Sequence, residues 1–208
     1  MKLLKLLHAV FQQEPWDEYL DRLTKSGIHS WGHGQSAIAF KHPTMPNVVV
    51  KVFTDKDLGY SYYLKWVTKN QNNPYAPKLH ESPEYSKKRN LEFAPNLGED
   101  HAYSIVFLEK LERSDPADRA DFFQKITPWL IAAGYDRGER GFDSFPRIGI
   151  QGWRILTKAP DSDIAALAKC FVRGKSQRLY LDLGNSFNIM QRGRQLVFTD
   201  PFLPGGGI

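Results

Sequence analysis

The stretch LDLGNSFNIMQRGRQLVFTD, residues 181–200, decides the fold of the C-terminal part of this 208-residue chain. Two short runs around Gly193 predict a β-hairpin, with Asn188 before its first strand and Asp200 after its second. Such a hairpin would hold both side chains on one rigid support. Carboxylate and amide oxygens are ligands that Mg²⁺ accepts, and Asp182 adds a second carboxylate six residues before Asn188. Asp and Asn are also common turn residues, so a role in turns is the alternative.

The N-terminal part carries a second informative stretch, GHGQSAIAF at residues 32–40, which is followed by VVVKVF at residues 48–53. The apolar runs and the polar turn that separates them predict two paired strands. Glycine lets backbone amides approach an anion without a Cβ clash. The amides of Gly32, Gly34 and Ser36 are therefore candidates for binding phosphate oxygens.

The lysine in the second of these strands, Lys51, is the only charged residue in its apolar run VVVKVF. An ammonium group in such a strand is unfavourable unless it has a partner, and nucleotide phosphates would be one. The alternative is a lysine at the strand edge whose side chain extends to water. Lys51 is therefore a candidate ligand of nucleotide phosphates.

The order of these elements, a glycine-rich hairpin, a strand lysine, a loop with Asp and Asn and a final Asp, resembles the signature motifs of protein kinases. The chain looks more closely like the small serine/threonine protein kinases that bacteriophages encode. Four motifs carry the resemblance, namely Gly32-His33-Gly34, His42-Pro43-Thr44-Met45-Pro46-Asn47, Asn188-Ile189-Met190 and Thr199-Asp200-Pro201. It covers residues 28–202, although between Arg113 and Arg178 only a helical pattern is matched.

The resemblance implies an α+β fold, the bilobal fold of protein kinases, with an antiparallel sheet in the N-lobe and a short, mainly helical C-lobe. Residues 1–27 would form a helical brace, residues 28–111 an N-lobe that ends in the hinge, and residues 112–208 a truncated C-lobe with the metal-binding hairpin. Kinases bind nucleotide in a groove where two such lobes meet, so both ends of the chain are expected to contribute to one site.

The activity that the resemblance implies is transfer of the γ-phosphoryl group of ATP to Ser or Thr hydroxyls of proteins, with ATP and Mg²⁺ as cofactors. The implied catalytic residues are Asp182, which orients the acceptor hydroxyl, and Lys51, which neutralises the phosphates. The implied nucleotide-binding residues are Gly32, Gly34, Ser36, Lys51, Glu109 and Leu111, and the implied metal ligands are Asn188 and Asp200.

Departures from the kinase pattern leave a second hypothesis open. Kinases place the acceptor-orienting Asp one residue nearer to the metal-binding Asn, where this chain has Leu183. Asp182 takes the role if Gly184 marks an inserted residue. The helix expected after Lys51 has no Glu, and Asp57 at its start is better suited to capping or to the helix dipole than to pairing with Lys51. These departures favour a pseudokinase, which would bind nucleotide or a host protein and act as a regulator or inhibitor without transfer.

The rest of the chain gives a coarse pattern of helices and strands. Apolar spacing predicts one helix that begins at Asp57, a second over Asp118–Ile131 and a third over Asp161–Phe171. The run Tyr103–Leu108 is typical of a strand. Residues 134–160 are rich in Gly and Arg and fit no element, so we expect a long ordered loop there that contacts substrate.

The composition is that of an ordinary globular protein, with 41% hydrophobic residues, 25% charged residues and a formal net charge of +5. Lysine and arginine are scattered, which disfavours a nucleic-acid partner and leaves a protein substrate or a host protein as the expected partner. The single cysteine, Cys170, excludes an internal disulfide. No apolar run is long enough to span a membrane, and Lys5 and His8 interrupt the leucine-rich start. We therefore expect a cytoplasmic protein, in the host cytoplasm if a phage encodes it.

Overall fold

The computed structural model describes residues 18, 21, 25, 30–33, 37–42, 45–54, 57–80, 103–135, 145–185 and 187–203. These residues form an α+β protein of two compact units. The first unit takes residues 1–57 and 78–110, and the second takes residues 58–77 and 111–208. Nearly all of the expected helical brace at residues 1–27 lies outside the described residues. Of the helices in the described ranges, none is long and apolar enough to cross a membrane.

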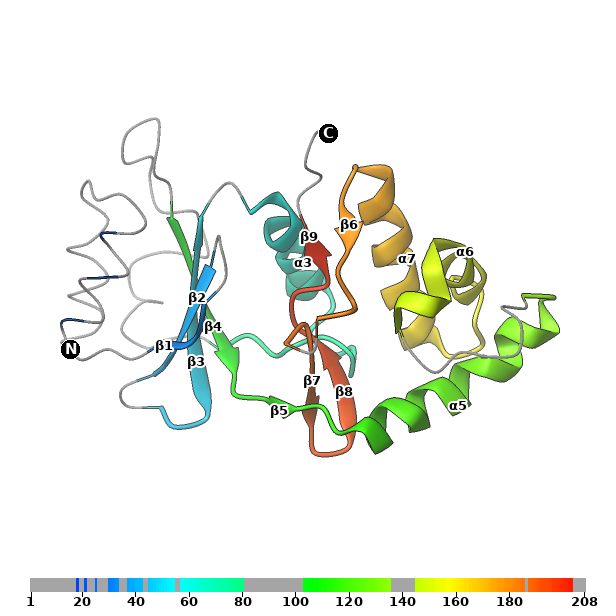
Figure 1. The fold of residues 1–208 in the computed structure, drawn as a ribbon, viewed down its shortest axis with the longest axis horizontal. Coiled ribbons are helices and arrows are strands. Elements are labelled where there is room, and N and C mark those ends of the chain that lie inside the picture. The colour runs from blue at the N-terminus through cyan, green and yellow to red at the C-terminus, as the bar shows by residue number, and fades with distance from the viewer. Residues whose placement is uncertain are drawn as a thin grey trace. The chain divides into compact units, whose positions relative to one another are not determined.

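The first unit contains a four-stranded antiparallel sheet in the order β1-β2-β3-β4 (Figure 1). Its strands are β1 (Ser30–His33), β2 (Ala37–Lys41), β3 (Val48–Thr54) and β4 (Tyr103–Glu109). The predicted hairpin is confirmed, because β2 pairs with β3 along its whole length. Valine suits a pleated, half-buried surface, and Val50 and Val52 of β3 are completely buried.

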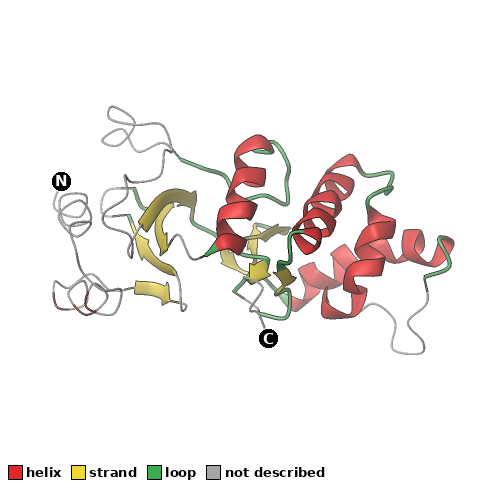
Figure 2. Cartoon of the chain, turned by 90° about the horizontal axis from the view of Figure 1, so that it is seen from above, coloured by secondary structure: helices red, strands yellow, loops and turns green. Residues whose placement is uncertain are grey.

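The second unit combines helices with two small antiparallel sheets (Figures 1 and 2). Its described helices are α3 (Leu58–Lys69), α5 (Pro116–Ala132), α6 (Phe145–Leu156) and α7 (Ser162–Ser176). One sheet has the order β5-β7-β8, and the other pairs β6 with β9. These strands are β5 (Glu112–Arg113), β6 (Tyr180–Leu181), β7 (Ile189–Arg192), β8 (Gln195–Phe198) and β9 (Phe202–Leu203). The predicted C-terminal hairpin is confirmed as β7 and β8, with Gly193 in its turn at a φ of 57°.

Local sequence explains where α5 and α7 begin. Asp115 caps α5 by accepting a hydrogen bond from an amide of the first turn, and Pro116 occupies that turn, where its missing N–H is no loss. Asp161 caps α7 by accepting from the amides of Asp163 and Ile164. The structure confirms both predicted helices, and α3 confirms the third.

The expectation of a loop over residues 134–160 is wrong in part, because residues 145–156 form α6. Gly149 has φ 56° and ψ 174°, so it divides this helix into two segments. Gly149 and Gly152 weaken the sequence signal, since glycine is a poor helix former. Burial holds the helix instead, and Trp153 is completely buried. A contact of this region with substrate stays a prediction.

Aromatic rings around Phe198 of β8 form the core of the second unit. The centroid of its ring lies 5.4 Å from those of Phe145 and Phe171 and 6.4 Å from that of Trp153. All three contacts are edge-on, the geometry that the quadrupoles of aromatic rings favour. Because these contacts fix Phe198 at the end of β8, they also fix the backbone two residues before Asp200.

Helix α3 belongs to the second unit by its contacts, whereas the sequence prediction counts it in a lobe over residues 28–111. The Tyr63 hydroxyl donates to the Phe198 carbonyl at 2.6 Å. Gly59 lets the helix lie close to β9, since a Cβ there would stand 2.8 Å from the Phe202 carbonyl oxygen. The contacts of α3 therefore support the segment on either side of Asp200.

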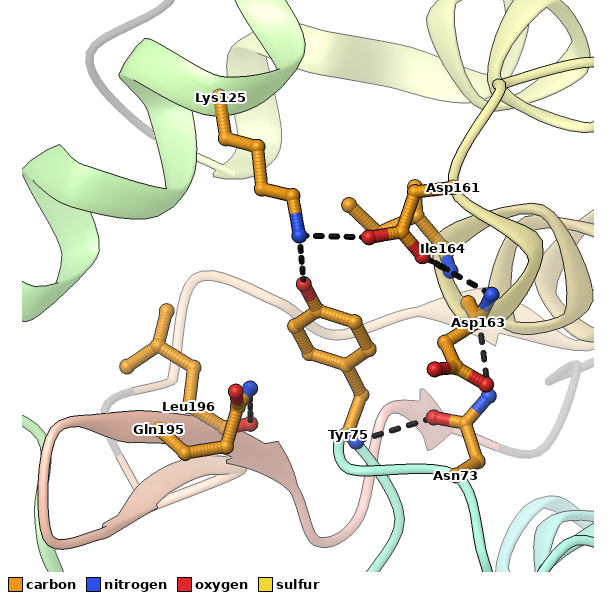
Figure 3. A network of polar contacts seen from close by, with 8 residues as sticks. All are labelled: Asn73, Tyr75, Lys125, Asp161, Asp163, Ile164, Gln195 and Leu196. Atoms are coloured by element: carbon orange, nitrogen blue, oxygen red, sulfur yellow. Dashed lines mark hydrogen bonds and ion pairs between the residues drawn. The ribbon is translucent and has the colours of Figure 1, made fainter.

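A polar network joins the loop after α3 to α5 and α7 (Figure 3). The Lys125 ammonium of α5 lies 2.5 Å from a carboxylate oxygen of Asp161 and 3.4 Å from the Tyr75 hydroxyl. Asn73 is buried, accepts from the Tyr75 amide and donates to the Asp163 carbonyl, both at 2.9 Å. The amide of Phe198, the last residue of β8, donates to the Tyr75 carbonyl at 2.9 Å. The network therefore also fixes the strand that leads to the candidate site.

The ion pair in this network shifts the pKa of both partners. Burial disfavours the charged form of Asp161, but the Lys125 ammonium and the amides of α7 outweigh burial and lower the pKa of this carboxyl. The hydrogen bond with Asp161 raises the pKa of Lys125. The contribution of the pair to stability is therefore complete above about pH 3.9 and below about pH 10.4, the ordinary pKa values of the two groups. It is lost as the pH falls through the lowered pKa of Asp161 or rises through the raised pKa of Lys125.

Replacing Asp161 with alanine is expected to lower the free energy of unfolding by about 1–2 kcal/mol, because the change removes a helix cap and a partly exposed ion pair. Asp161→Asn is the matched control, since asparagine still caps α7, and it should cost less than about 1 kcal/mol at pH 7. Urea unfolding at pH 7 and at about pH 2.5 measures both. The difference that separates Asp161→Asn from the native chain should shrink at the lower pH. An undiminished difference there would contradict the contribution of the ion pair.

Candidate functional site

Three candidate residues of the second unit, Asp182, Asn188 and Asp200, lie at the ends of paired strands. Beside the β6–β9 pair, the Asp182 amide donates to the Pro201 carbonyl at 2.9 Å. At the end of the β7–β8 hairpin, the Thr199 amide donates to the Asn188 carbonyl at 2.8 Å. Asp200 thus stands between Thr199, which bonds to Asn188, and Pro201, which bonds to Asp182. The backbone therefore brings all three candidates together.

The side chain of Asn188 joins it directly to Asp182. Its Nδ2 atom donates to the Asp182 carbonyl oxygen at 2.8 Å and to Oδ2 of the Asp182 carboxylate at 2.9 Å. Both partners only accept, so these bonds assign Nδ2 and not Oδ1 to this position. Asn188 is 8% exposed, and its amide is held with little freedom. The remaining atom, Oδ1, is a neutral oxygen donor of the kind that divalent cations accept.

The extra residue between Asp182 and Asn188 does not separate them. The loop closes on itself, because the Asn188 amide donates to the Asn185 carbonyl at 3.1 Å and the Phe187 amide donates to Oδ1 of Asn185 at 3.0 Å. Asn185 is therefore the turn former of this loop. Leu183, at the position where kinases have their Asp, is buried, while Asp182 is half-buried.

Two hydroxyl groups that support the site, those of Tyr63 and Thr199, are not among the residues expected from the sequence. The Tyr63 hydroxyl donates to the Phe198 carbonyl; burial raises its pKa well above the usual value, and the charge of Asp200 adds to the shift. The Thr199 hydroxyl donates to the Phe187 carbonyl at 2.8 Å. The motif around Asp200 is a signal for Thr199, but Tyr63 fits an ordinary apolar helix position.

The donor set suits magnesium. Two carboxylates and one amide are hard oxygen ligands, and Mg²⁺ is usually held by one or two carboxylates together with substrate phosphates. Within the described ranges, no group of three or more His, Cys, Asp or Glu side chains could hold a metal ion by itself. By ligand chemistry alone, Asn188 and Asp200 are donors that Mg²⁺ accepts, and an ion held by these two residues would need further ligands.

In the first unit, the register of the sheet places Gly32 and Lys51 in one row. Gly32 of β1 lies opposite Ala39 of β2, and Ala39 in turn lies opposite Lys51 of β3. Residues directly opposite each other share a face of a sheet, so Lys51 has Ala39 and Gly32 beside it on the β2 side and Val106 of β4 on the other side. Lys51 itself is half-buried. The other predicted phosphate-binding positions, Gly34 and Ser36, lie outside the described residues.

The expected hinge residues Glu109 and Leu111 belong to different units. The Glu109 amide donates to the Lys78 carbonyl at 3.0 Å, and Oε1 of Glu109 accepts from the Lys78 amide at 2.7 Å. The Lys110 amide donates to the Asn47 carbonyl at 2.8 Å, and Leu111 is buried. These bonds hold the end of β4 in the sheet. A main-chain contact of Glu109 and Leu111 with adenine stays a prediction.

The helix that follows Lys51 in the chain, α3, has no acidic residue. Helix α3 reads LGYSYYLKWVTK and contains neither Glu nor Asp. Asp57, the residue directly before it, is buried. The acidic partner that kinases place on this helix is therefore missing from α3 itself, and a capping role for Asp57 stays a prediction.

The sequence matches no protein-family model, and no curated protein is significantly similar to it. Function therefore has to be inferred from the chemistry of these residues and not from relatives.

Proposed function

We propose that the chain is an ATP-dependent protein kinase with the bilobal protein-kinase-like fold, which transfers the γ-phosphoryl group to Ser or Thr of a protein in the cytoplasm. The observation that carries the proposal is the double hydrogen bond from Nδ2 of Asn188 to Asp182. It brings together a carboxylate that can orient a hydroxyl and an amide that can bind a metal. Asp200, on the adjoining backbone, supplies the anionic metal ligand that phosphoryl transfer also requires.

The proposal gives a role to each group of candidate residues. Lys51 would neutralise charge on the α and β phosphates, and the amides of the glycine segment at Gly32 would bind their oxygens. Asn188 and Asp200 would hold Mg²⁺, which would offset the charge that develops on the transferred group. The reaction asks little covalent chemistry of the protein, so positioning and electrostatics would provide most of the rate.

Asp182 would orient the attacking hydroxyl. Asn188 occupies Oδ2 of its carboxylate, and Oδ1 makes no hydrogen bond within the described part of the chain. Because Asp182 is only half-buried, Oδ1 can accept a hydrogen bond from a Ser or Thr hydroxyl. The bond from Asn188 would hold the carboxylate in place for that contact.

A pseudokinase is the second candidate function, and the composition of α3 favours it. Kinases pair the strand lysine with a Glu on the following helix, and α3 has no such residue. A pseudokinase would bind Mg²⁺-ATP or a protein partner and would regulate that partner without transfer.

Thermal unfolding with and without Mg²⁺-ATP is the first test of the proposal. At about a hundred times its dissociation constant, the nucleotide is expected to stabilise the protein by about 2.7 kcal/mol. Label transfer from γ-labelled ATP to a library of Ser- and Thr-containing peptides then separates the two candidates. Stabilisation without labelling would favour the pseudokinase, and the absence of both would overturn the kinase proposal.

Replacing Lys51 with methionine is expected to weaken Mg²⁺-ATP binding by about tenfold to a hundredfold, because a charge-assisted hydrogen bond contributes about 1.5–3 kcal/mol. Methionine keeps the apolar part of the side chain, so the sheet should persist. The matched control is Lys41→Met, which removes an exposed lysine from β2 of the same sheet. Titration calorimetry with Mg²⁺-ATP measures both variants. Equal affinities in the two would remove Lys51 from the nucleotide site.

A further inference from the structure

The residue directly before Asn188 is a large aromatic one, Phe187, and 55% of its surface is exposed. Its backbone is fixed on both sides, because its amide donates to Oδ1 of Asn185 and its carbonyl accepts from the Thr199 hydroxyl. The exposed ring is therefore carried by a residue whose amide and carbonyl are both hydrogen-bonded. An aromatic face held in this way, next to the proposed catalytic residues, is available to contact a ligand.

The guanidinium of Arg113 covers this ring, with Cζ 4.7 Å from the ring centroid. Strand β5 holds Arg113 there, because Arg113 pairs with Met190 of β7. The next residue, Ser114, donates from its hydroxyl to the Ile189 carbonyl at 2.8 Å. A guanidinium stacked on a ring can still direct its N–H groups at an anion. We call these two residues, Arg113 and Phe187, the Arg113–Phe187 platform.

The carboxylates near Arg113 in the sequence do not pair with its guanidinium. Glu112 lies on the opposite face of β5, since successive residues of a strand alternate. Asp115 caps α5, and Asp118 lies 3.4 Å from Nε of Arg194. Among the described residues, none forms an ion pair with Arg113. The platform therefore presents a positive charge that suits an acidic ligand.

We propose that the Arg113–Phe187 platform binds a Glu or Asp side chain that flanks the acceptor Ser or Thr of the protein substrate. The inference rests on the proposed kinase function, because the acceptor hydroxyl has to reach Asp182. Phe187 adjoins Asn188, which bonds to Asp182, and an extended peptide advances by about 3.3 Å per residue. A residue close to the acceptor therefore comes within reach of the guanidinium. Arg113 supplies charge-assisted bonds in a bidentate geometry, and Phe187 aligns it.

Two peptides, each with a single Ser, test the platform as a specificity determinant. One has Glu on both sides of the Ser and the other has Lys. The native chain is expected to use the Glu peptide with a kcat/KM about tenfold higher, mainly through KM, and Arg113→Glu is expected to reverse the preference. Lys169→Glu makes the same change of charge at an exposed position of α7 and should keep the native preference. Phe187→Ala should lose part of the preference, and Phe187→Tyr should keep it.

The inference and the kinase proposal fail in different ways. Equal use and equal binding of both peptides by the native chain and Arg113→Glu would overturn the inference and leave the kinase proposal intact. If Mg²⁺-ATP neither stabilises the chain nor labels a peptide, the kinase proposal falls. Fluorescence anisotropy of a dye-labelled Glu peptide then still tests the platform. Binding that Arg113→Glu weakens about tenfold supports it, and binding that the variant leaves unchanged overturns it.

Discussion

Replacing Asp200 with asparagine is expected to remove both the stabilisation by Mg²⁺-ATP and the transfer of phosphate. The amide oxygen is neutral, so Mg²⁺ would lose its anionic protein ligand and the nucleotide its bridge to that ligand. For a chain of 208 residues, loss of about 2.7 kcal/mol of ligand stabilisation corresponds to a melting temperature about 5–10 °C lower in the presence of nucleotide. The rate of transfer should fall by at least about a thousandfold.

The Asp200→Asn variant should melt close to the native chain when no nucleotide is present. Asparagine has the shape of aspartate, and neither the backbone bonds at Thr199 and Pro201 nor the bond from the Thr199 hydroxyl to the Phe187 carbonyl uses the side chain of Asp200. Asp121→Asn is the matched control, because it removes a carboxylate whose ion pair with Arg194 lies at the surface. This control should keep the full nucleotide shift in a thermal melt and the full rate of label transfer. A full shift in Asp200→Asn as well would exclude Asp200 as a metal ligand.

The elements that the sequence predicts correctly are those with local causes. The run over residues 48–53 is rich in valine, and Asp161 supplies the cap of α7, so neither depends on distant contacts for its signal. The C-terminal hairpin is similar, because its turn needs the positive φ that Gly193 adopts. The sequence could therefore place Lys51 on a strand and Asn188 and Asp200 at the two ends of a hairpin.

Helix α6 could not be predicted, because packing and not propensity stabilises it. Its Trp153 ring is completely buried, 4.7 Å between centroids from the ring of Phe171. A Cβ at Gly152 would stand 2.7 Å from a side-chain atom of Ile148 and 2.9 Å from one of Tyr135. The glycine that hides the helix from a sequence pattern is thus required by the close contacts of the folded chain.

The position of Asp182 relative to Asn188 also depends on contacts that a sequence pattern does not carry. Strands β6 and β9 have two residues each, too few to show an alternation of apolar and polar residues. They pair where Phe202 packs against α7, and a Cβ at Gly174 would stand 2.4 Å from the Phe202 ring. The sequence therefore raises the question of the extra residue near Gly184, but only the tertiary packing places Asp182 next to Asn188.

Replacing Asp182 with alanine is expected to slow transfer by about 10²–10⁴-fold and to leave the stabilisation by Mg²⁺-ATP unchanged. The variant lacks the carboxylate that would orient the hydroxyl. Its backbone still offers a carbonyl to Nδ2 of Asn188 and an amide to the Pro201 carbonyl. The proposed metal ligands should therefore keep their places, so that binding and transfer separate in this variant but not in Asp200→Asn.

Two further variants decide what the bond to Asn188 does. Asp182→Asn keeps the size of the side chain and can accept from Nδ2 of Asn188 through its own oxygen, so it should bind nucleotide and transfer poorly. Asn188→Ala removes a metal ligand and the bond to Asp182 together, so both binding and transfer should weaken. Single-turnover rates at saturating Mg²⁺-ATP separate the chemical step from binding. Transfer at the native rate by either Asp182 variant would mean that no carboxylate is needed there, and the double hydrogen bond from Asn188 would then have only a structural role.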